Sequence, residues 1–283
     1  MVKNAVAFGR KDCYASPLWL SRCDGRAPEI PPLRAGLMNP LEWLCYRPMK
    51  GQFREFFGIS CQFEPACREE YRRRLSPLLE MPLRPRVLFF MTDYLRVAPW
   101  PLSRYGEWSI LLRSRRREQE GWFPLTMPVT TWIAKLGGHH LGFPKCIVDS
   151  IKVTPLPEDG ESNVRGRAIH QGVTHVEALF TTGREPIVES DRLPLDRATP
   201  AMYAEPLHVL KPVGIGPAEA EVSFRNVLPA KWVVRHGTVA LDGPVGLFQG
   251  GLLPPSRRSE GCSFHFVGGS HLEWGGRVRR ALA

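Results

Sequence analysis

The sequence predicts an α+β protein that is built mainly from antiparallel β-strands, with a few short helices packed outside them. The 26 Gly and 27 Pro among 283 residues are more than long helices tolerate and are typical of short strands joined by turns. Hydrophobic residues also alternate with small or polar ones along several segments, which is the period of a half-buried strand. These patterns fit a sandwich or a barrel, and periodicity alone does not distinguish the two.

The composition is that of a folded protein with a sizeable core. Hydrophobic residues make up 43% of the chain and charged residues 23%. The 7 Cys are irregularly spaced without a CxxC pair, which favours reduced thiols over a disulfide framework or a zinc site. The N-terminus lacks a continuous apolar segment of a secretion signal, and no stretch approaches the ~20 apolar residues of a membrane-spanning helix. We therefore expect a cytoplasmic protein that binds neither a metal nor a membrane.

The net charge of +10 raises the question of an anionic partner such as a nucleic acid. The basic runs at residues 72–74 and 113–117 are short, are flanked by glutamates and contain no motif that reads nucleic acid. We expect these runs to be solvated or subunit-contacting faces, with an anionic partner as the alternative.

The order of the elements follows from periodicity and from turn residues. Prolines interrupt residues 1–50, which we expect to form an extended arm. Alternation over residues 57–63 predicts the first strand, and a helical stripe over residues 66–79 predicts a short amphipathic helix. Further strands are expected over residues 87–95, 107–113 and 123–128.

A second helix is predicted where apolar residues recur at i, i+3, i+4 and i+7 from Val129 to Leu136, and Gly137-Gly138 is expected to end it. The strands that follow are expected over residues 147–153, 165–171, 173–181, 218–225 and 232–240. The break at Gln171-Gly172 indicates a hairpin.

One lysine stands out by its surroundings. Residues 139–148 place Lys145 among Leu, Phe, Pro, Cys, Ile and Val. A lysine amine is a nucleophile only when it is neutral, and an apolar pocket disfavours the ammonium form. Alternatively, Lys145 begins a strand and extends its amine to solvent, as most lysines do. These residues alone leave both interpretations open.

The segment Phe143-Pro144-Lys145, followed by an apolar strand, is similar to the active-site segment of acetoacetate decarboxylases. In that family the lysine after aromatic-Pro forms an imine with the substrate. Two earlier segments, Arg54-Glu55-Phe56-Phe57 and Tyr105-Gly106-Glu107, resemble family segments in the same order, and two later ones match more loosely. The resemblance implies a domain over residues 51–275 with a barrel-like core and peripheral helices, followed by a C-terminal tail at 276–283.

The resemblance also implies a chemistry. Lys145 would form a Schiff base with a β-keto acid, Arg54 would orient a carboxylate, and Glu107 would transfer protons or position the arginine. Alternatively, Arg54 and Glu107 form an ordinary ion pair at the surface or at the barrel end. The imine itself is the electron sink, so no cofactor is expected. A homo-oligomer is expected by resemblance, with the arm contributing contacts.

The sequence departs from the family at two places. Cys146 stands where a second lysine would help to keep the amine neutral, and Gly138 and His139 replace an Arg-Glu pair. The adjacent His139 and His140 either cap a helix end or supply a general acid or base. We expect both histidines, Phe143 and Cys146 to line the substrate pocket.

These observations predict a lyase that decarboxylates a β-keto acid. The substrate would be acetoacetate-like or larger, and an intermediate of secondary metabolism would fit this class. Some members of the wider superfamily instead condense, dehydrate or cyclise pyruvate-like α-keto acids, which is the first alternative. The second alternative is a non-catalytic ligand-binding barrel, in which Lys145 would stay protonated and form no imine.

Overall fold

The computed structural model describes residues 49–98, 104–156, 163–182, 188–189, 201–213, 216–227, 232–243, 252, 258–266 and 271–280. The expected N-terminal arm lies outside these residues, except for its last two, which begin the first strand. Within the described part of the chain, no helix combines the length and the apolar character needed to cross a membrane.

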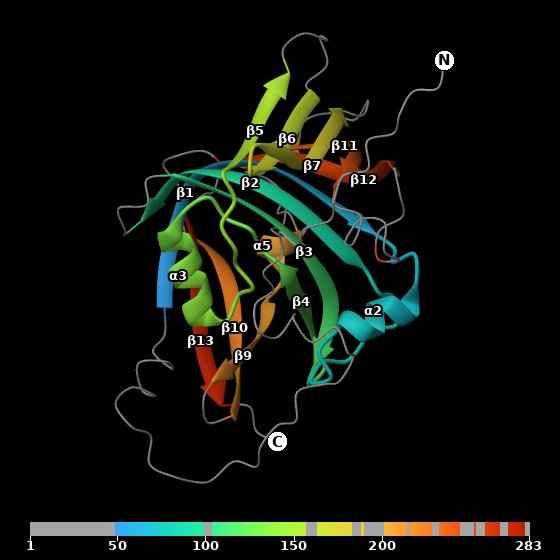
Figure 1. Ribbon diagram of the computed structural model, residues 1–283, viewed down its shortest axis with the longest axis vertical. Coiled ribbons are helices and arrows are strands. Elements are labelled where there is room, and N and C mark those ends of the chain that lie inside the picture. Colours follow the sequence, from blue (N-terminus) through green and yellow to red (C-terminus); the bar gives the residue numbers. More distant parts are fainter. Residues whose placement is uncertain are drawn as a thin grey trace. The chain divides into compact units, whose positions relative to one another are not determined.

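Seven strands close into a barrel (Figure 1). In spatial order they are β13 (His271–Arg280), β10 (Gly216–Val227), β9 (Leu207–Val213), β4 (Gln119–Thr126), β3 (Tyr105–Arg116), β2 (Val87–Ala98) and β1 (Met49–Phe63). The ring closes because β1 also pairs with β13. All of these pairings are antiparallel except that of β4 with β9. The predicted mainly antiparallel architecture is confirmed, and the choice between sandwich and barrel is decided for the barrel.

A second set of strands extends the sheet from β1. It comprises β12 (Arg258–Phe266), β11 (Trp232–Asp242), β7 (Val173–Thr182), β6 (Asn163–His170) and β5 (Ser150–Leu156), with the short β8 (Val188–Glu189) beside β11. The first part of β1 pairs with β13, and the part from Phe56 to Cys61 pairs with β12. The register of β1 against β2 shifts between Phe53 and Phe56, and such a bulge bends a strand. One long strand therefore serves both the barrel and the outer sheet.

Two hydrophobic cores lie on the two faces of the barrel strands, as β2 shows. In β2, Leu88, Phe90 and Tyr94 belong to the core inside the barrel. Phe89 and Met91 belong to a second core that includes residues of β5, β6 and β7. Because both faces are buried, this strand begins with a continuous apolar run, Val87–Met91, rather than an alternating one.

The predicted helices form, with corrections to their ends and faces. Helix α2 (Arg68–Arg74) covers only part of the predicted stripe. Helix α3 (Trp132–Leu141) begins after Thr131, whose hydroxyl accepts from the backbone N of Ala134. It runs through Gly137-Gly138 and ends at Gly142, which has a φ of 90°. The prediction that the two glycines end this helix is wrong, because the left-handed residue that a helix end favours comes four positions later.

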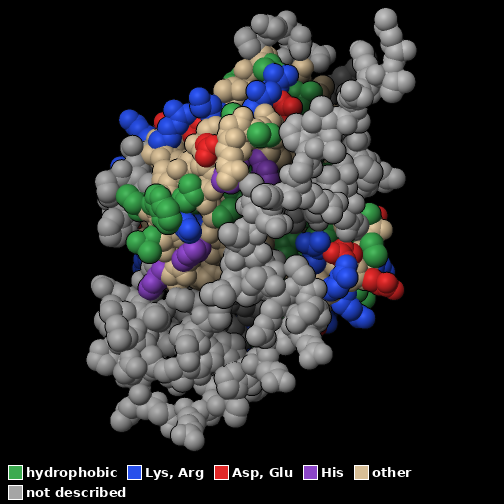
Figure 2. Space-filling view, in the orientation of Figure 1, with side chains coloured by type: hydrophobic (Ala, Val, Ile, Leu, Met, Phe, Trp, Pro, Cys, Tyr) green, Lys and Arg blue, Asp and Glu red, His purple; other side chains and the backbone are tan. Residues whose placement is uncertain are grey.

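Two of the apolar residues whose spacing predicted α3 are mostly exposed. The exposed fractions are 70% for Trp132 and 73% for Leu136. The buried residues are instead Ala134, Gly138 and Leu141. Small residues on this face allow α3 to lie close against β13 (Figure 1), where a Cβ at Gly276 would overlap Leu141. Figure 2 shows hydrophobic side chains gathered over α3.

The second half of the chain was predicted less completely. The hairpin of β6 and β7 is confirmed, with Gln171 and Gly172 at φ values of 51° and 73° in its two-residue turn. Strands β9, β12 and β13 and the short helix α5 (Ala201–Ala204) were not predicted. Since β13 runs to Arg280, residues 276–280 pair with β10 in the barrel, and the expectation of a tail from residue 276 is wrong for them.

Glutamates neutralise several cations of the two basic runs. Arg73 and Arg74 both contact Glu70 within α2. In the second run, Arg113 lies 2.6 Å from Glu120, and Arg115 lies 2.6 Å from Glu80. These cations are thus engaged locally by glutamates, of which Glu70 is buried.

Candidate active site

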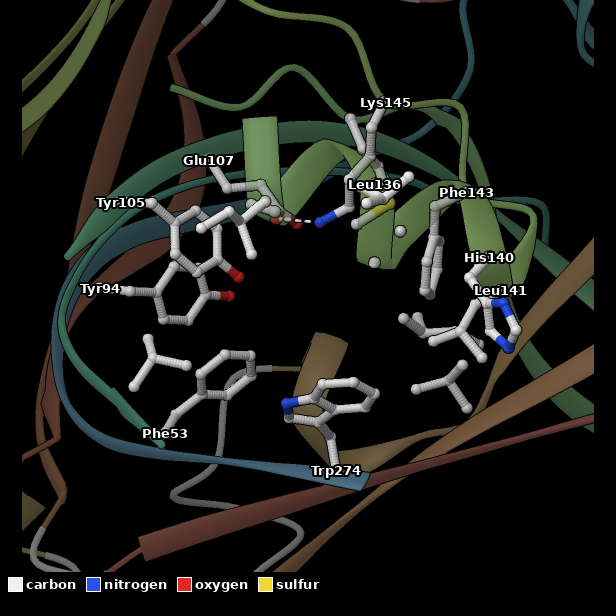
Figure 3. Close-up of a pocket in the computed structure, with 18 of the residues that line it drawn as sticks. Phe53, Tyr94, Tyr105, Glu107, Leu136, His140, Leu141, Phe143, Lys145 and Trp274 are labelled. Atoms are coloured by element: carbon white, nitrogen blue, oxygen red, sulfur yellow. Dashed lines mark hydrogen bonds and ion pairs between the residues drawn. The ribbon is translucent and has the colours of Figure 1, made fainter. Parts of the chain in front are cut away.

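A cavity of about 730 Å³ lies in the barrel near the end at which β2 finishes and β3 begins (Figure 3). Barrel strands provide most of its walls, and α3 covers one side. The apolar lining side chains include Phe53, Val97, Met127, Ile133, Leu136, Leu141, Phe143, Met202, Leu207, Val222, Phe224 and Trp274. Its polar lining residues are Lys50, Tyr94, Tyr105, Glu107, His140 and Lys145. The cavity is thus a mostly apolar site with a few polar groups, as is common for small-molecule sites.

The loop that carries Lys145 is held in place through Val129. The backbone N of Val129 donates to the carbonyl of Cys146 at 2.8 Å, and its carbonyl accepts from the N of Val148 at 3.0 Å. Val129 also forms a β-bridge with Glu107 on β3. One residue therefore links the lysine loop to the strand that carries the glutamate, which explains why residues 38 positions apart meet.

Lys145 and Glu107 form a buried pair inside the cavity. The Nζ of Lys145 lies 2.6 Å from Oε2 of Glu107, with side-chain exposures of 8% and 3% (Figure 3). A short hydrogen bond of this kind suits a charged donor or acceptor, and burial excludes the water that would otherwise separate the groups. The geometry allows a proton to pass directly between the amine and the carboxylate.

The last turn of α3 packs directly on the lysine. A Cβ at Gly138 would overlap Cδ and Cε of Lys145, so only glycine leaves room for the extended side chain. The Nε2–H of His139 donates to the backbone carbonyl of Lys145 at 2.7 Å. Both contacts constrain the position from which the amine enters the cavity.

Two tyrosines flank the buried pair. The rings of Tyr94 and Tyr105 stack with centroids 4.7 Å apart. Burial raises the pKa of Tyr105, and the negative charge of Glu107 and a hydrogen bond to it raise this pKa further. Burial also raises the pKa of Tyr94, whose hydroxyl lies 2.8 Å from that of Tyr203. Both phenols are therefore neutral near pH 7 and can donate a proton in a hydrogen bond.

Comparison with known proteins finds no matching family model and no relative among curated proteins. Solved structures do match. Acetoacetate decarboxylase from Legionella pneumophila has a TM-score of 0.58 at 18% identity, over 89% of this chain and 92% of that one. Another acetoacetate decarboxylase structure has a TM-score of 0.61 at 15% identity, over 87% and 96%. The chain has the acetoacetate decarboxylase fold.

The same fold is found in an enzyme of a different name. The enduracididine biosynthesis enzyme MppR complexed with pyruvate has a TM-score of 0.57 at 19% identity. The match covers 82% of this chain and 90% of that one. The acetoacetate decarboxylase fold is thus shared by enzymes of more than one kind.

Four of the predicted site residues lie around the cavity of this acetoacetate decarboxylase fold: Lys145, Glu107, Phe143 and His140. His139 does not line it, because its ring turns to the backbone of Lys145. Its neighbour His140 lines the cavity wall opposite Tyr105 in Figure 3.

The structure places the other two predicted residues elsewhere. Arg54 is exposed on β1, next to the inward-facing Phe53, and does not line the cavity. Arg54 falls in the irregular part of β1, since Phe53 pairs with Val97 and the next paired residue is Glu55. Cys146 is likewise outside the lining, and burial raises the pKa of its thiol. The expectations that Arg54 and Cys146 face the site are therefore wrong.

Sequence reasoning missed several cavity residues. Tyr105 precedes Glu107 by two positions in a strand, and this spacing puts both side chains on one face. That signal was present in the sequence. Trp274 gave no comparable signal, because its strand β13 was not predicted. Among the described residues, no group of three or more His, Cys, Asp or Glu is arranged to hold a metal ion.

Proposed function

We propose that the protein is a lyase that binds a keto acid covalently, as a Schiff base on Lys145. The observation that carries this proposal is the Lys145 amine, which lies in a mostly apolar cavity 2.6 Å from the Glu107 carboxylate. The acetoacetate decarboxylase fold adds support, since the lysine occupies the segment that resembles the imine-forming segment of that family. Decarboxylation of a β-keto acid is the reaction we propose first.

In the first step Glu107 accepts a proton from the ammonium group of Lys145. The two groups are buried and lie 2.6 Å apart, so the proton can pass between them without an intervening water. The free amine then adds to the keto carbon. One proton moves from the newly bonded nitrogen to the oxygen and Glu107 returns the other, so the oxygen leaves as water and the positively charged imine remains.

In the second step the bond between the α-carbon and the carboxylate carbon breaks. Its electron pair moves toward the imine nitrogen, so carbon dioxide leaves and a neutral enamine remains on Lys145. A proton taken up from solvent is then added at the α-carbon, which restores the positively charged imine. The neutral Tyr105 hydroxyl or a re-protonated Glu107 would relay it. Water then hydrolyses the imine, which releases the ketone and restores the amine.

A second reaction is favoured by the position of Glu107. Aldol condensation by an α-keto acid requires a base that removes a proton from the carbon next to the imine, whereas decarboxylation releases carbon dioxide without one. Glu107 lies beside the amine that would be bonded to the imine carbon, and the carbon that loses the proton is the next one along. The structure of MppR with pyruvate supports the fit of such acids to this fold.

Borohydride trapping tests the proposal. The protein is incubated with acetoacetate, benzoylacetate, pyruvate or phenylpyruvate and reduced, and the adduct is located by mass spectrometry. We expect an adduct on Lys145 that is absent from Lys145→Ala and present in Lys152→Ala, which removes an exposed lysine on β5. Release of carbon dioxide identifies a decarboxylase, and a condensed product formed with an added aldehyde identifies an aldolase. If no keto acid gives an adduct, the protein is instead a ligand-binding barrel.

A further inference from the structure

The cavity is large for the smallest keto acids. Its volume of about 730 Å³ falls in the range of roughly 300–1,000 Å³ that is typical of sites for drug-sized ligands. Acetoacetate and pyruvate have only a few carbon atoms, so either would leave most of the cavity to water. Burial of apolar ligand surface against apolar walls is favourable, and a small acid would use little of that contact.

Four aromatic rings form a row along one side of the cavity, the ring row: Tyr105, Tyr94, Phe53 and Trp274. Successive centroids lie 4.7, 4.4 and 6.4 Å apart, and the successive planes are inclined by only 25°, 28° and 30°. The row begins beside the reactive amine, because Nζ of Lys145 lies 5.8 Å from the Tyr105 ring. In Figure 3 the four rings follow the cavity from Glu107 round to Trp274.

The charged groups are confined to one part of the lining. Apart from the pair of Lys145 and Glu107, the only other Lys, Arg, Asp or Glu among the described lining residues is Lys50. Lys50 is exposed, which puts its ammonium at the rim. No arginine among these residues offers the planar fork that clamps a small carboxylate. The inner wall away from the amine therefore contacts a ligand almost entirely through apolar and aromatic atoms.

We propose that the site acts on keto acids that carry an aryl group. The keto carbon reacts with Lys145, and the aryl group lies along the ring row toward Trp274. This proposal rests on the Schiff-base function proposed above and specifies its substrate class. Stacked and edge-on ring contacts stabilise such a ligand beyond the area that it buries.

The first test compares matched substrates. Benzoylacetate and phenylpyruvate should be trapped on Lys145 with a second-order rate constant at least about tenfold above those of acetoacetate and pyruvate, since tenfold is the effect of one well-placed aromatic contact. Equal or faster trapping of the small acids would overturn the proposed substrate class and leave the Schiff-base function intact.

The second test does not depend on the imine. Binding of 4-phenylbutyrate, which has no keto group, is measured by calorimetry on the wild-type protein and compared with that of butyrate. We expect saturable binding of the aryl acid only. Trp274→Ala should weaken it about tenfold, whereas Trp132→Ala, which removes an exposed tryptophan outside the lining, should not change it.

A second variant, which fills part of the cavity, keeps the proposal testable if Trp274→Ala does not fold. Ala98 is half-buried in the lining, so a phenyl group in Ala98→Phe would enter the cavity without replacing core contacts. It should lower the ratio of the benzoylacetate trapping rate to the acetoacetate trapping rate about tenfold or more. If 4-phenylbutyrate does not bind, or if Ala98→Phe affects both acids equally, the aryl proposal is wrong. If 4-phenylbutyrate binds but no keto acid is trapped, the Schiff-base proposal is wrong, and the cavity is still a site for aryl acids.

Discussion

Gly138 and Lys145 are in direct contact, and the contact leaves no room for a side chain at position 138. A methyl group there would overlap the middle of the lysine side chain. The two residues belong to the last turn of α3 and to the loop that follows it, so the end of the helix sets the path of the lysine. The amine reaches Glu107 along this path.

Gly138→Ala should therefore separate stability from reactivity. Alanine is the better helix former by about 1 kcal/mol, so the melting temperature should be unchanged or higher. Trapping of keto acids on Lys145 should fall at least about tenfold, because the amine is displaced from Glu107. Gly275→Ala is the matched control, since no atom lies within 4 Å of the added methyl group there. Normal trapping in Gly138→Ala would show that the lysine takes another path.

Glu107→Gln should slow imine formation and make it more dependent on pH. The amide keeps the size of the side chain but does not accept a proton from Lys145, and loss of a general base typically lowers rates by about 10²–10⁴. Raising the pH should restore much of the trapping rate, since hydroxide then removes the lysine proton. The control Glu80→Gln breaks an exposed ion pair with Arg115 and should have no effect on trapping. A variant that is impaired equally at every pH would point to a structural role for Glu107.

The buried tyrosines should make the protein less stable in base. The pKa values of Tyr94 and Tyr105 are raised in the folded state, so their stabilising contribution is complete below pH 10, the ordinary pKa, and decreases above it. Above pH 10 each should lower the free energy of unfolding by about 1.4 kcal/mol per pH unit. Denaturant titrations of wild type and Tyr105→Phe measure this slope. An equal slope in both proteins would contradict the assignment.

His208 should make the protein less stable in acid. Its Nδ1 lies 3.0 Å from the hydroxyl of Ser114, and burial lowers its pKa from 6.5 to about 4. A depressed pKa contributes stability that is present above pH 6.5 and is lost as the pH falls toward 4. His208→Gln should flatten the stability profile in this window, as measured by thermal melts at a series of pH values. A profile unchanged from wild type would refute the role of His208.

Cys146→Lys tests whether a side chain at position 146 reaches the Lys145 amine. A second lysine at this position was expected to face the amine and to favour its neutral form. The side chain at position 146 does not line the cavity, so we now expect the pH dependence of trapping to stay unchanged. A marked shift of the profile would show that a lysine at this position reaches the site after all.

Local patterns predicted the elements whose two faces differ or whose turns have a distinctive sequence. The alternation over residues 57–63, at the end of β1, and the turn at Gln171-Gly172 are examples. The spacing that predicted α3 did not show which face packs on the barrel, since its small residues do so while Trp132 and Leu136 stay exposed. Periodicity identifies an amphipathic stripe but does not show whether close packing or apolar area decides which side is buried.

The candidate site was predictable to the extent that its residues lie in distinctive segments. Lys145 follows an aromatic-Pro pair, and Glu107 lies in a segment that resembles the family. Their contact depends on the β-bridges of Val129 to Glu107 and to Ile147, which are pairings that no local pattern contains. The same limit explains the misplacement of Arg54, since a register shift of β1 decides which of its side chains enter the barrel.

The central claim is that the Lys145 amine forms an imine with a keto acid. Its most direct test is the mass of the intact protein after incubation with benzoylacetate and reduction by borohydride, followed by peptide mapping. We expect one adduct per chain, on the peptide that contains Lys145, and none in Lys145→Ala. An unmodified protein, or an adduct that persists in Lys145→Ala, would contradict it.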